Sequence, residues 1–160
     1  MARVCLVGAD DVTLQYELLS RETSRNALAA YDLEEPFYNA IAVETVSLGA
    51  AVALLNDLDW YLARFVGSAF VREPSVSEAE WLSREMATAI RDGEVAPNDS
   101  GRFLEIYGLE PVESSSDDRA QQRLVEPMLV ARTGQTVPEY DLRDVEETLT
   151  VRLTESEFGA

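Results

Sequence analysis

Short apolar runs and alternating segments predict several β-strands. The run Arg3–Val7 ends at Gly8 and predicts a first strand that is buried on both faces. Four later segments are rich in branched or aromatic residues and predict further strands, at 39–46, 103–109, 124–132 and 148–153.

The segment 12–19 fits two kinds of element. Apolar and polar residues alternate through it, which favours a second strand that pairs with the first as a hairpin. The same residues also begin a helical stripe that continues to Ala30, and in that case Asp10 or Asp11 caps one long helix. We favour the hairpin, and the helix stays open as the alternative.

Serine residues mark the starts of three predicted helices. Ser20 precedes a helix over 21–31, and Ser47 precedes a dominant helix over 48–66. Ser77 and Glu80 form an S-x-x-E capping box for a helix that ends at Arg91. The helix over 48–66 is apolar around most of its surface, so it lies at the centre of the core or also meets a partner chain.

These elements predict an α+β fold. We expect a mostly antiparallel sheet of about five to six strands with three helices packed on one face. The 160 residues fit one domain, 1–160, and the polar, Ser- and Asp-rich stretch 113–122 predicts a mobile surface loop.

Charge is the strongest compositional signal. Thirty acidic residues face thirteen basic ones, the formal net charge is −17, and every basic residue is arginine. Such a surface repels itself in dilute buffer, but at about 1 M salt the Debye length falls to about 3 Å and the repulsion is screened. Acid spread along the whole chain, rather than in blocks, favours a halophile's cytoplasm over an acidic nucleic-acid mimic. The sequence has no row of basic residues that could bind phosphates, so a nucleic-acid partner is not expected.

The composition also removes much catalytic chemistry. The chain has no His and no Lys, which excludes the usual Ser-His-Asp sites, most zinc sites and Schiff-base chemistry. The lone Cys5 lies in an apolar run and is read as a buried hydrophobic residue. We predict no catalytic residue, metal or cofactor. Without a signal peptide or membrane span, a cytoplasmic location is expected.

Five residues are candidates for binding. Arg21 and Arg25 lie one helical turn apart, so they are candidates for holding an anionic ligand; pairing with nearby acids is the plainer alternative. Trp60 and Arg64 share a helical face, and Trp81 lies off the apolar stripe of its predicted helix. These three are candidates for an interface with a protein partner or a second copy, and burial in the core is their plainer alternative.

Four segments resemble a small family of uncharacterised haloarchaeal proteins: YELLSRETSRNAL (16–28), AVETVSLGAAVALLNDLDWYLARFV (42–66), PSVSEAEWLSREMATAIRDGEV (74–95) and PEYDLRDVEETLTVRLTESEFGA (138–160). The resemblance agrees with a halophilic origin and implies no activity. The sequence therefore favours a non-enzymatic interaction or regulatory domain. A sensor of small anionic ligands is the alternative, and an enzyme that uses carboxylates or a metal ranks third.

Overall fold

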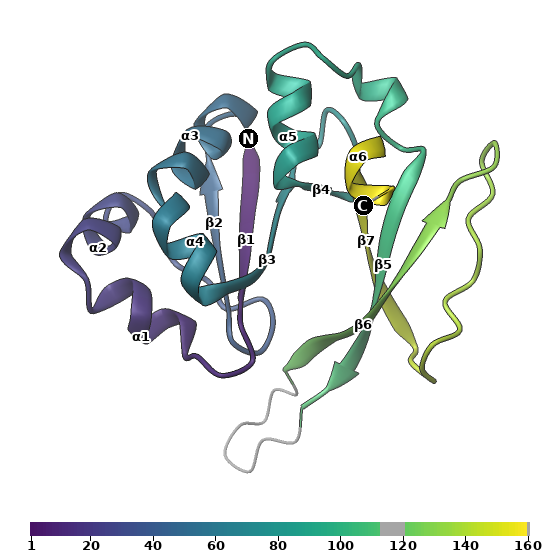
Figure 1. Ribbon diagram of the computed structural model, residues 1–160. Coiled ribbons are helices and arrows are strands. Elements are labelled where there is room, and N and C mark those ends of the chain that lie inside the picture. The colour runs from purple at the N-terminus through teal and green to yellow at the C-terminus, as the bar shows by residue number, and fades with distance from the viewer. Residues whose placement is uncertain (113–120, 160) are drawn as a thin grey trace.

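In the computed structural model, which describes residues 1–112 and 121–159, seven strands form one sheet. Their order across the sheet is β2-β1-β3-β4-β7-β5-β6 (Figure 1). The strands are β1 (Ala2–Gly8), β2 (Ala40–Thr45), β3 (Val66–Arg72), β4 (Trp81–Ser83), β5 (Phe103–Pro111), β6 (Gln122–Ala131) and β7 (Glu147–Leu153).

The α+β class is confirmed, and the details of the sheet differ from expectation. Five neighbouring pairs are antiparallel, but β4 and β7 run parallel, so the sheet is mixed and open. Within the described residues it has seven strands rather than five to six. The extra strands are β3, which shares only Val66 with the predicted helix over 48–66, and β4, which lies within the helix predicted to end at Arg91.

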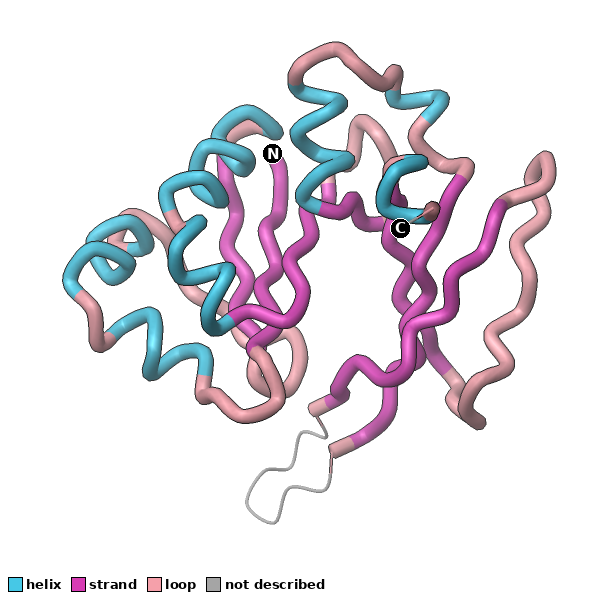
Figure 2. The backbone as a smooth tube through the Cα atoms, in the orientation of Figure 1, coloured by secondary structure: helices cyan, strands magenta, loops and turns pink. Residues whose placement is uncertain are grey.

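Six α-helices accompany the sheet in the described part of the chain, twice the expected number. The first four pack over β2, β1 and β3, and α5 follows β4 (Figures 1 and 2). We call this group of strands and helices the helical half, and β7, β5 and β6 the hairpin half. The helices are α1 (Leu14–Leu19), α2 (Glu22–Leu28), α3 (Leu48–Asp57), α4 (Asp59–Phe65), α5 (Arg84–Arg91) and α6 (Glu155–Phe158).

The predicted hairpin at 12–19 is wrong, because this segment forms helix α1. Leu14 and Leu18, one turn apart, are both fully buried, which is the spacing of a helix that packs on a core. The alternative of one long helix is also only partly right, since Ser20 and Arg21 separate α1 from α2. The cap of α1 comes from a distant residue: the Asn39 side-chain oxygen accepts from the Leu14 backbone nitrogen at 2.8 Å.

The predicted helix over 48–66 is two helices followed by the start of a strand. Ser47 caps α3 as expected, with its hydroxyl accepting from the Ala50 nitrogen. The chain leaves helical geometry at Leu58, which is fully buried, and α4 starts at the next residue. From Val66 onward the alternation of β3 replaces the helix: Phe70 packs on one face of the sheet and Val71 on the other.

The predicted helix over 77–91 begins only at Arg84. Ser77 does accept from the Glu80 backbone nitrogen at 3.0 Å, but the chain then enters strand β4. Trp81 and Leu82 are both buried, on opposite faces of the sheet, and a strand satisfies this requirement. Ser83 is the actual cap of α5 and accepts from the Met86 nitrogen.

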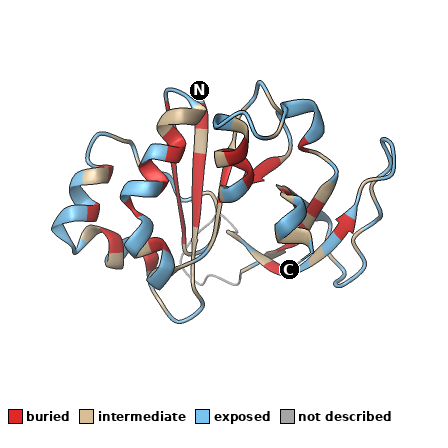
Figure 3. Ribbon diagram, turned by 45° about the horizontal axis from the view of Figure 1, so that its top comes forward, coloured by how far each residue is buried: buried red, intermediate tan, exposed pale blue. Residues whose placement is uncertain are grey.

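Three apolar clusters hold the fold together, and buried residues line the inner faces of helices and strands (Figure 3). The largest lies between the helices and one face of β2-β1-β3, around Val4, Leu55 and Leu82. A second lies between the two halves and includes Phe70 and Val151. The third covers the opposite face of the hairpin half.

Two further expectations concern the loop at 113–122 and membrane-spanning helices. Most of the loop predicted at 113–122 lies outside the described residues, and β6 begins at Gln122. Among the described helices, none combines the length and the apolar composition needed to span a membrane.

Candidate functional site

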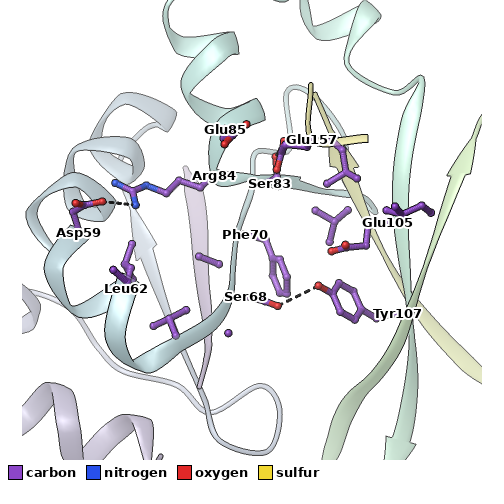
Figure 4. Close-up of a pocket in the computed structure, with 17 residues that line it drawn as sticks. Asp59, Leu62, Ser68, Phe70, Ser83, Arg84, Glu85, Glu105, Tyr107 and Glu157 are labelled. Carbon is purple, nitrogen blue, oxygen red and sulfur yellow. Dashed lines mark hydrogen bonds and ion pairs between the residues drawn. The ribbon is translucent and has the colours of Figure 1, made fainter. Parts of the chain in front are cut away.

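A cavity of about 530 Å³ opens between the helical half and the hairpin half (Figure 4). Its wall on the helical side comes from α4, β3 and the start of α5, and its opposite wall from β5, β6 and β7. Its apolar lining includes Leu62, Phe70, Leu129, Val151 and Leu153.

Curvature of the sheet creates this cavity. Strands β3 and β5 are separated by β4 and β7, so in a flat sheet they would lie roughly 14 Å apart. Yet the Ser68 hydroxyl on β3 lies 3.1 Å from the Tyr107 hydroxyl on β5. The two halves therefore fold toward each other, and the period of two along each strand directs Ser68 and Phe70 toward Tyr107 (Figure 4).

Tyr107 is a neutral hydrogen-bonding group in this cavity. Burial raises its pKa well above the ordinary value, and the nearby Glu105 carboxylate raises that pKa further, while the hydrogen bond with Ser68 opposes both. These directions fit an arrangement in which the Ser68 hydroxyl donates to the Tyr107 oxygen and the Tyr107 hydroxyl is oriented toward the Glu105 carboxylate. Glu105 and Tyr107 share one face of β5 because they are two residues apart.

The rim nearest α5 is held by polar contacts between elements. The Arg84 guanidinium donates to the Asp59 carboxylate at 2.8 Å and to the Asn56 side-chain oxygen at 3.1 Å. On the other side, the Ser83 hydroxyl donates to the Glu157 carboxylate at 2.6 Å, and Glu157 also completes the capping box of α6. The contacts that start at Ser83 and Arg84 thus fix both sides of the opening.

The cavity lining is acidic. Four carboxylates face one guanidinium, which belongs to Arg84, and Asp59 already pairs with it. Glu105 makes no ion pair within the described residues, so its charge is available to a ligand. The remaining carboxylates are Glu85 and Glu157. No group of three or more potential metal-ligating His, Cys, Asp or Glu side chains occurs in the described part of the chain.

Three of the predicted binding residues come together elsewhere, at a surface formed by α4 and the start of α2. The Arg64 guanidinium carbon lies 3.8 Å from the centroid of the Trp60 ring, and that of Arg21 lies 5.7 Å from it. Trp60 is 47% exposed between them. Arg21 was predicted as a ligand residue and Trp60 as an interface residue, and the structure makes them neighbours. We call Arg21, Trp60 and Arg64 the Trp60 surface.

The other two predicted residues lie apart from the Trp60 surface. Arg25 is exposed on α2, and its side chain makes no ion pair or hydrogen bond within residues 1–112 and 121–159. Trp81 is only 6% exposed, because it belongs to strand β4 and packs edge-to-face on Phe70 at 5.8 Å. The Arg72 guanidinium covers its ring at 4.9 Å.

The residues that build the cavity were not singled out from the sequence. Ser68 and Phe70 lie in a strand that was not predicted, although V-G-S-A-F-V-R has the alternation and branched residues of a strand. Glu105 and Tyr107 lie in a correctly predicted strand. Their signal was the presence of two polar groups, two residues apart, on one face of an otherwise apolar segment.

Comparison with known proteins gives one match. No curated protein and no solved structure matches the chain. Residues 2–109 match DUF5804, described as a family of unknown function. The matched stretch runs from β1 through most of β5 and includes the Trp60 surface, Ser68, Glu105 and Tyr107. Because the match covers more than half of the sequence, the chain belongs to the DUF5804 family.

Proposed function

We propose that this protein is a non-enzymatic binding domain for a small molecule that carries an amine or guanidinium next to an apolar group. The observation that supports this proposal is the cavity between the halves, which combines an apolar wall with a surplus of carboxylates. Its volume of about 530 Å³ suits a metabolite-sized ligand.

The charges in the cavity favour a cationic ligand. Arg84 is already paired with Asp59, whereas Glu105 lies beside the neutral Tyr107 and has no basic partner within the described residues. A ligand ammonium or guanidinium would supply the charge-assisted partner that Glu105 lacks. The apolar part of the ligand would pack on Phe70 and displace water from it.

Two titratable side chains, Tyr107 in the cavity and Cys5 outside it, argue for binding rather than catalysis. A tyrosine is protonated at neutral pH, and the raised pKa of Tyr107 strengthens that preference, so Tyr107 serves as a hydrogen-bonding group and not as a base. Burial raises the pKa of the Cys5 thiol to about 12, so Cys5 is a poor nucleophile.

We further propose that the domain works in a halophile's cytoplasm. This proposal is supported by the net charge of −17, the exclusive use of arginine among basic residues, and the resemblance to haloarchaeal sequences. In concentrated salt, bare surface charge attracts ligands weakly because of screening. Selective binding of a cation then depends on a partly enclosed cavity, where screening is smaller.

Calorimetric titration of the full chain in 2–3 M KCl tests the proposed function. The probes are agmatine, benzylamine and spermidine, with benzoate as an anion of similar shape to benzylamine. We expect saturable binding of at least one cation and none of benzoate. Glu105→Gln should weaken that binding about tenfold or more, since a hydrogen bond to a charged group contributes about 1.5–3 kcal/mol.

The matched control is Glu146→Gln, which removes the same charge from an exposed residue outside the cavity. This variant should bind like the wild type. Absence of binding by all three cations, or an equal loss in the Glu105 and Glu146 variants, would contradict the proposal.

A second candidate function is the docking of a protein partner on the Trp60 surface. Aromatic and arginine side chains often dominate binding energy at interfaces, and here a half-exposed Trp60 lies between two guanidinium groups. Arg64 makes no ion pair within the described residues. We therefore commit to a partner that presents an acidic segment.

Binding of a synthetic Asp- and Glu-rich peptide, followed by tryptophan fluorescence at the lowest KCl concentration at which the chain stays folded, tests this second candidate, because concentrated salt screens surface charge. The variants are measured with a labelled peptide, because Trp60→Ala removes the fluorescent side chain. Trp60→Ala and Arg64→Gln should abolish binding, whereas Tyr38→Ala, at another exposed aromatic residue, should not. A dimer seen by light scattering and lost in Trp60→Ala would indicate a second copy as the occupant and contradict the acidic partner.

A further inference from the structure

A second cavity, of about 480 Å³, lies at the end of the β5–β6 hairpin where β5 begins and β6 ends. It is formed by the turn before β5 and the segment that follows β6. Its lining residues are Asn98, Asp99, Gly101, Arg102, Arg132 and Gly134.

Two arginines of this cavity face each other across the hairpin. The Arg132 backbone nitrogen donates to the Arg102 carbonyl at 2.8 Å, which extends the β5–β6 ladder by one pair beyond Phe103 and Ala131. Like charges directly opposite each other on neighbouring strands are unfavourable. Acidic residues outnumber arginines more than twofold in this chain, so an arginine pair here needs an explanation.

A single glutamate, Glu80, forms ion pairs with two arginines next to this cavity. Glu80 accepts from the Arg152 Nε at 2.7 Å and from an Arg132 terminal nitrogen, so both of its oxygens are engaged. Arg152 also donates to the Ser100 hydroxyl at 2.9 Å. Arg102 makes no ion pair or side-chain hydrogen bond within the described residues.

Arg132 retains an unsatisfied donor. Its Nε is buried and has no hydrogen-bond partner in the described part of the chain. Buried donors are nearly always paired in native proteins, so this exception needs an explanation, and a bound ion is one. Gly101 keeps space beside this guanidinium, because a Cβ at Gly101 would lie 2.7 Å from an Arg132 terminal nitrogen.

The charges at the cavity sum in favour of an anion. Among its lining residues, Arg102 and Arg132 carry two positive charges and Asp99 carries one negative charge, which leaves one positive charge. Asp99 lines the cavity but makes no ion pair with these arginines.

We propose that this cavity binds a small oxyanion, either free phosphate or sulfate or the phosphate group of a metabolite, between Arg102 and Arg132. Guanidinium groups present several donors in a fixed fork that matches the oxygens of such an anion. The anion would separate the two like charges and supply an acceptor next to the buried Arg132 donor. This site is distinct from the acidic cavity and selects the opposite charge.

Binding of inorganic phosphate, sulfate and AMP to the full chain at constant ionic strength in KCl tests this proposal, with calorimetric titration as the measurement. Arg102→Gln is the main variant because Arg102 is exposed and makes no ion pair, so the fold should survive. We expect saturable binding by the wild type and about a tenfold or larger loss in Arg102→Gln. Tight binding of phosphate would indicate the free anion, and binding of AMP alone would indicate a phosphate ester.

Two further variants sharpen the result. Arg123→Gln removes an arginine that pairs with Glu110 farther along the same hairpin and should leave binding unchanged. Asp99→Asn removes the carboxylate from the cavity lining and should tighten binding. The proposal is overturned if none of the three anions binds saturably, or if the Arg102 and Arg123 variants lose binding equally.

Discussion

Replacing Glu80 with glutamine should destabilise the fold more than any single change at an exposed ion pair. Glu80 lies before β4, whereas Arg132 and Arg152 belong to the hairpin half. The side chains of Glu80 and Arg152 are only 19% and 12% exposed, so solvent screens this network weakly. Removal of the carboxylate leaves two guanidinium groups with no acidic partner among the described residues.

The size of the effect follows from the contacts that are lost. Breaking a buried ion pair by removing one partner costs about 3–5 kcal/mol. Glutamine keeps one acceptor oxygen, and the site is partly exposed, so we expect a loss of about 3 kcal/mol in the free energy of unfolding. For a chain of this size that corresponds to a fall of about 6–12 °C in Tm.

Urea unfolding at constant 3 M KCl, followed by circular dichroism, measures this loss. The matched control is Glu44→Gln, in the exposed pair between Glu44 and Arg3, where the glutamate side chain is 43% exposed. Exposed pairs contribute about 0–1 kcal/mol, so this variant should stay close to the wild type. If both variants lost the same free energy with unchanged m values, the reasoning about burial would be refuted.

Three further outcomes can be measured. Asn39→Ala should lower the free energy of unfolding in urea by about 3 kcal/mol, because Asn39 accepts from the Leu14 nitrogen, donates to the Val12 carbonyl at 2.8 Å and adopts a φ of 53°. Asn39→Gly should lose less, because glycine tolerates that φ. Folding favours the protonated form of Tyr107, so the stability that this form contributes is complete below the ordinary pKa of 10.0 and falls as the pH rises above that value. Tyr107→Phe should reduce this fall. Equal profiles of stability against pH for the variant and the wild type would contradict the raised pKa of Tyr107. Cys5 is fully buried with a pKa raised to about 12, so Ellman's reagent should label it only on unfolding, and the labelling rate at constant pH should rise steeply as KCl is lowered from 3 M to 0.1 M; a rate independent of salt would contradict a salt-dependent fold.

Local sequence signals predicted part of the fold correctly. Branched, alternating residues located β2, β5, β6 and β7, and the apolar run ending at Gly8 located β1, because side-chain burial along these segments follows their period of two. Ser47 identified the start of α3 through a contact between residues only three apart.

The errors arose where distant residues decide local structure. Helix α1 obtains its cap from Asn39, which is 25 residues away, so alternation within 12–19 was a misleading guide. Glu80 completed a capping-box pattern with Ser77, but its side chain is used by two arginines of the hairpin half instead. The cavity was not predicted for the same reason, because Ser68 and Tyr107 come into contact only through the curvature of the folded sheet.

The junction between the two halves explains why both the network and the cavity lie there. Strand β4 has three residues and forms only two paired positions with β3 and two with β7, so backbone hydrogen bonds join the halves over a short length. Side chains must therefore supply the rest of the connection. The apolar cluster around Phe70 and Val151 does so on one side, and Glu80 with Arg132 and Arg152 does so on the other. Where this packing stops, the curved sheet leaves the space that Glu105 and Tyr107 line, so a ligand there would contact both halves and stabilise their arrangement in proportion to its affinity.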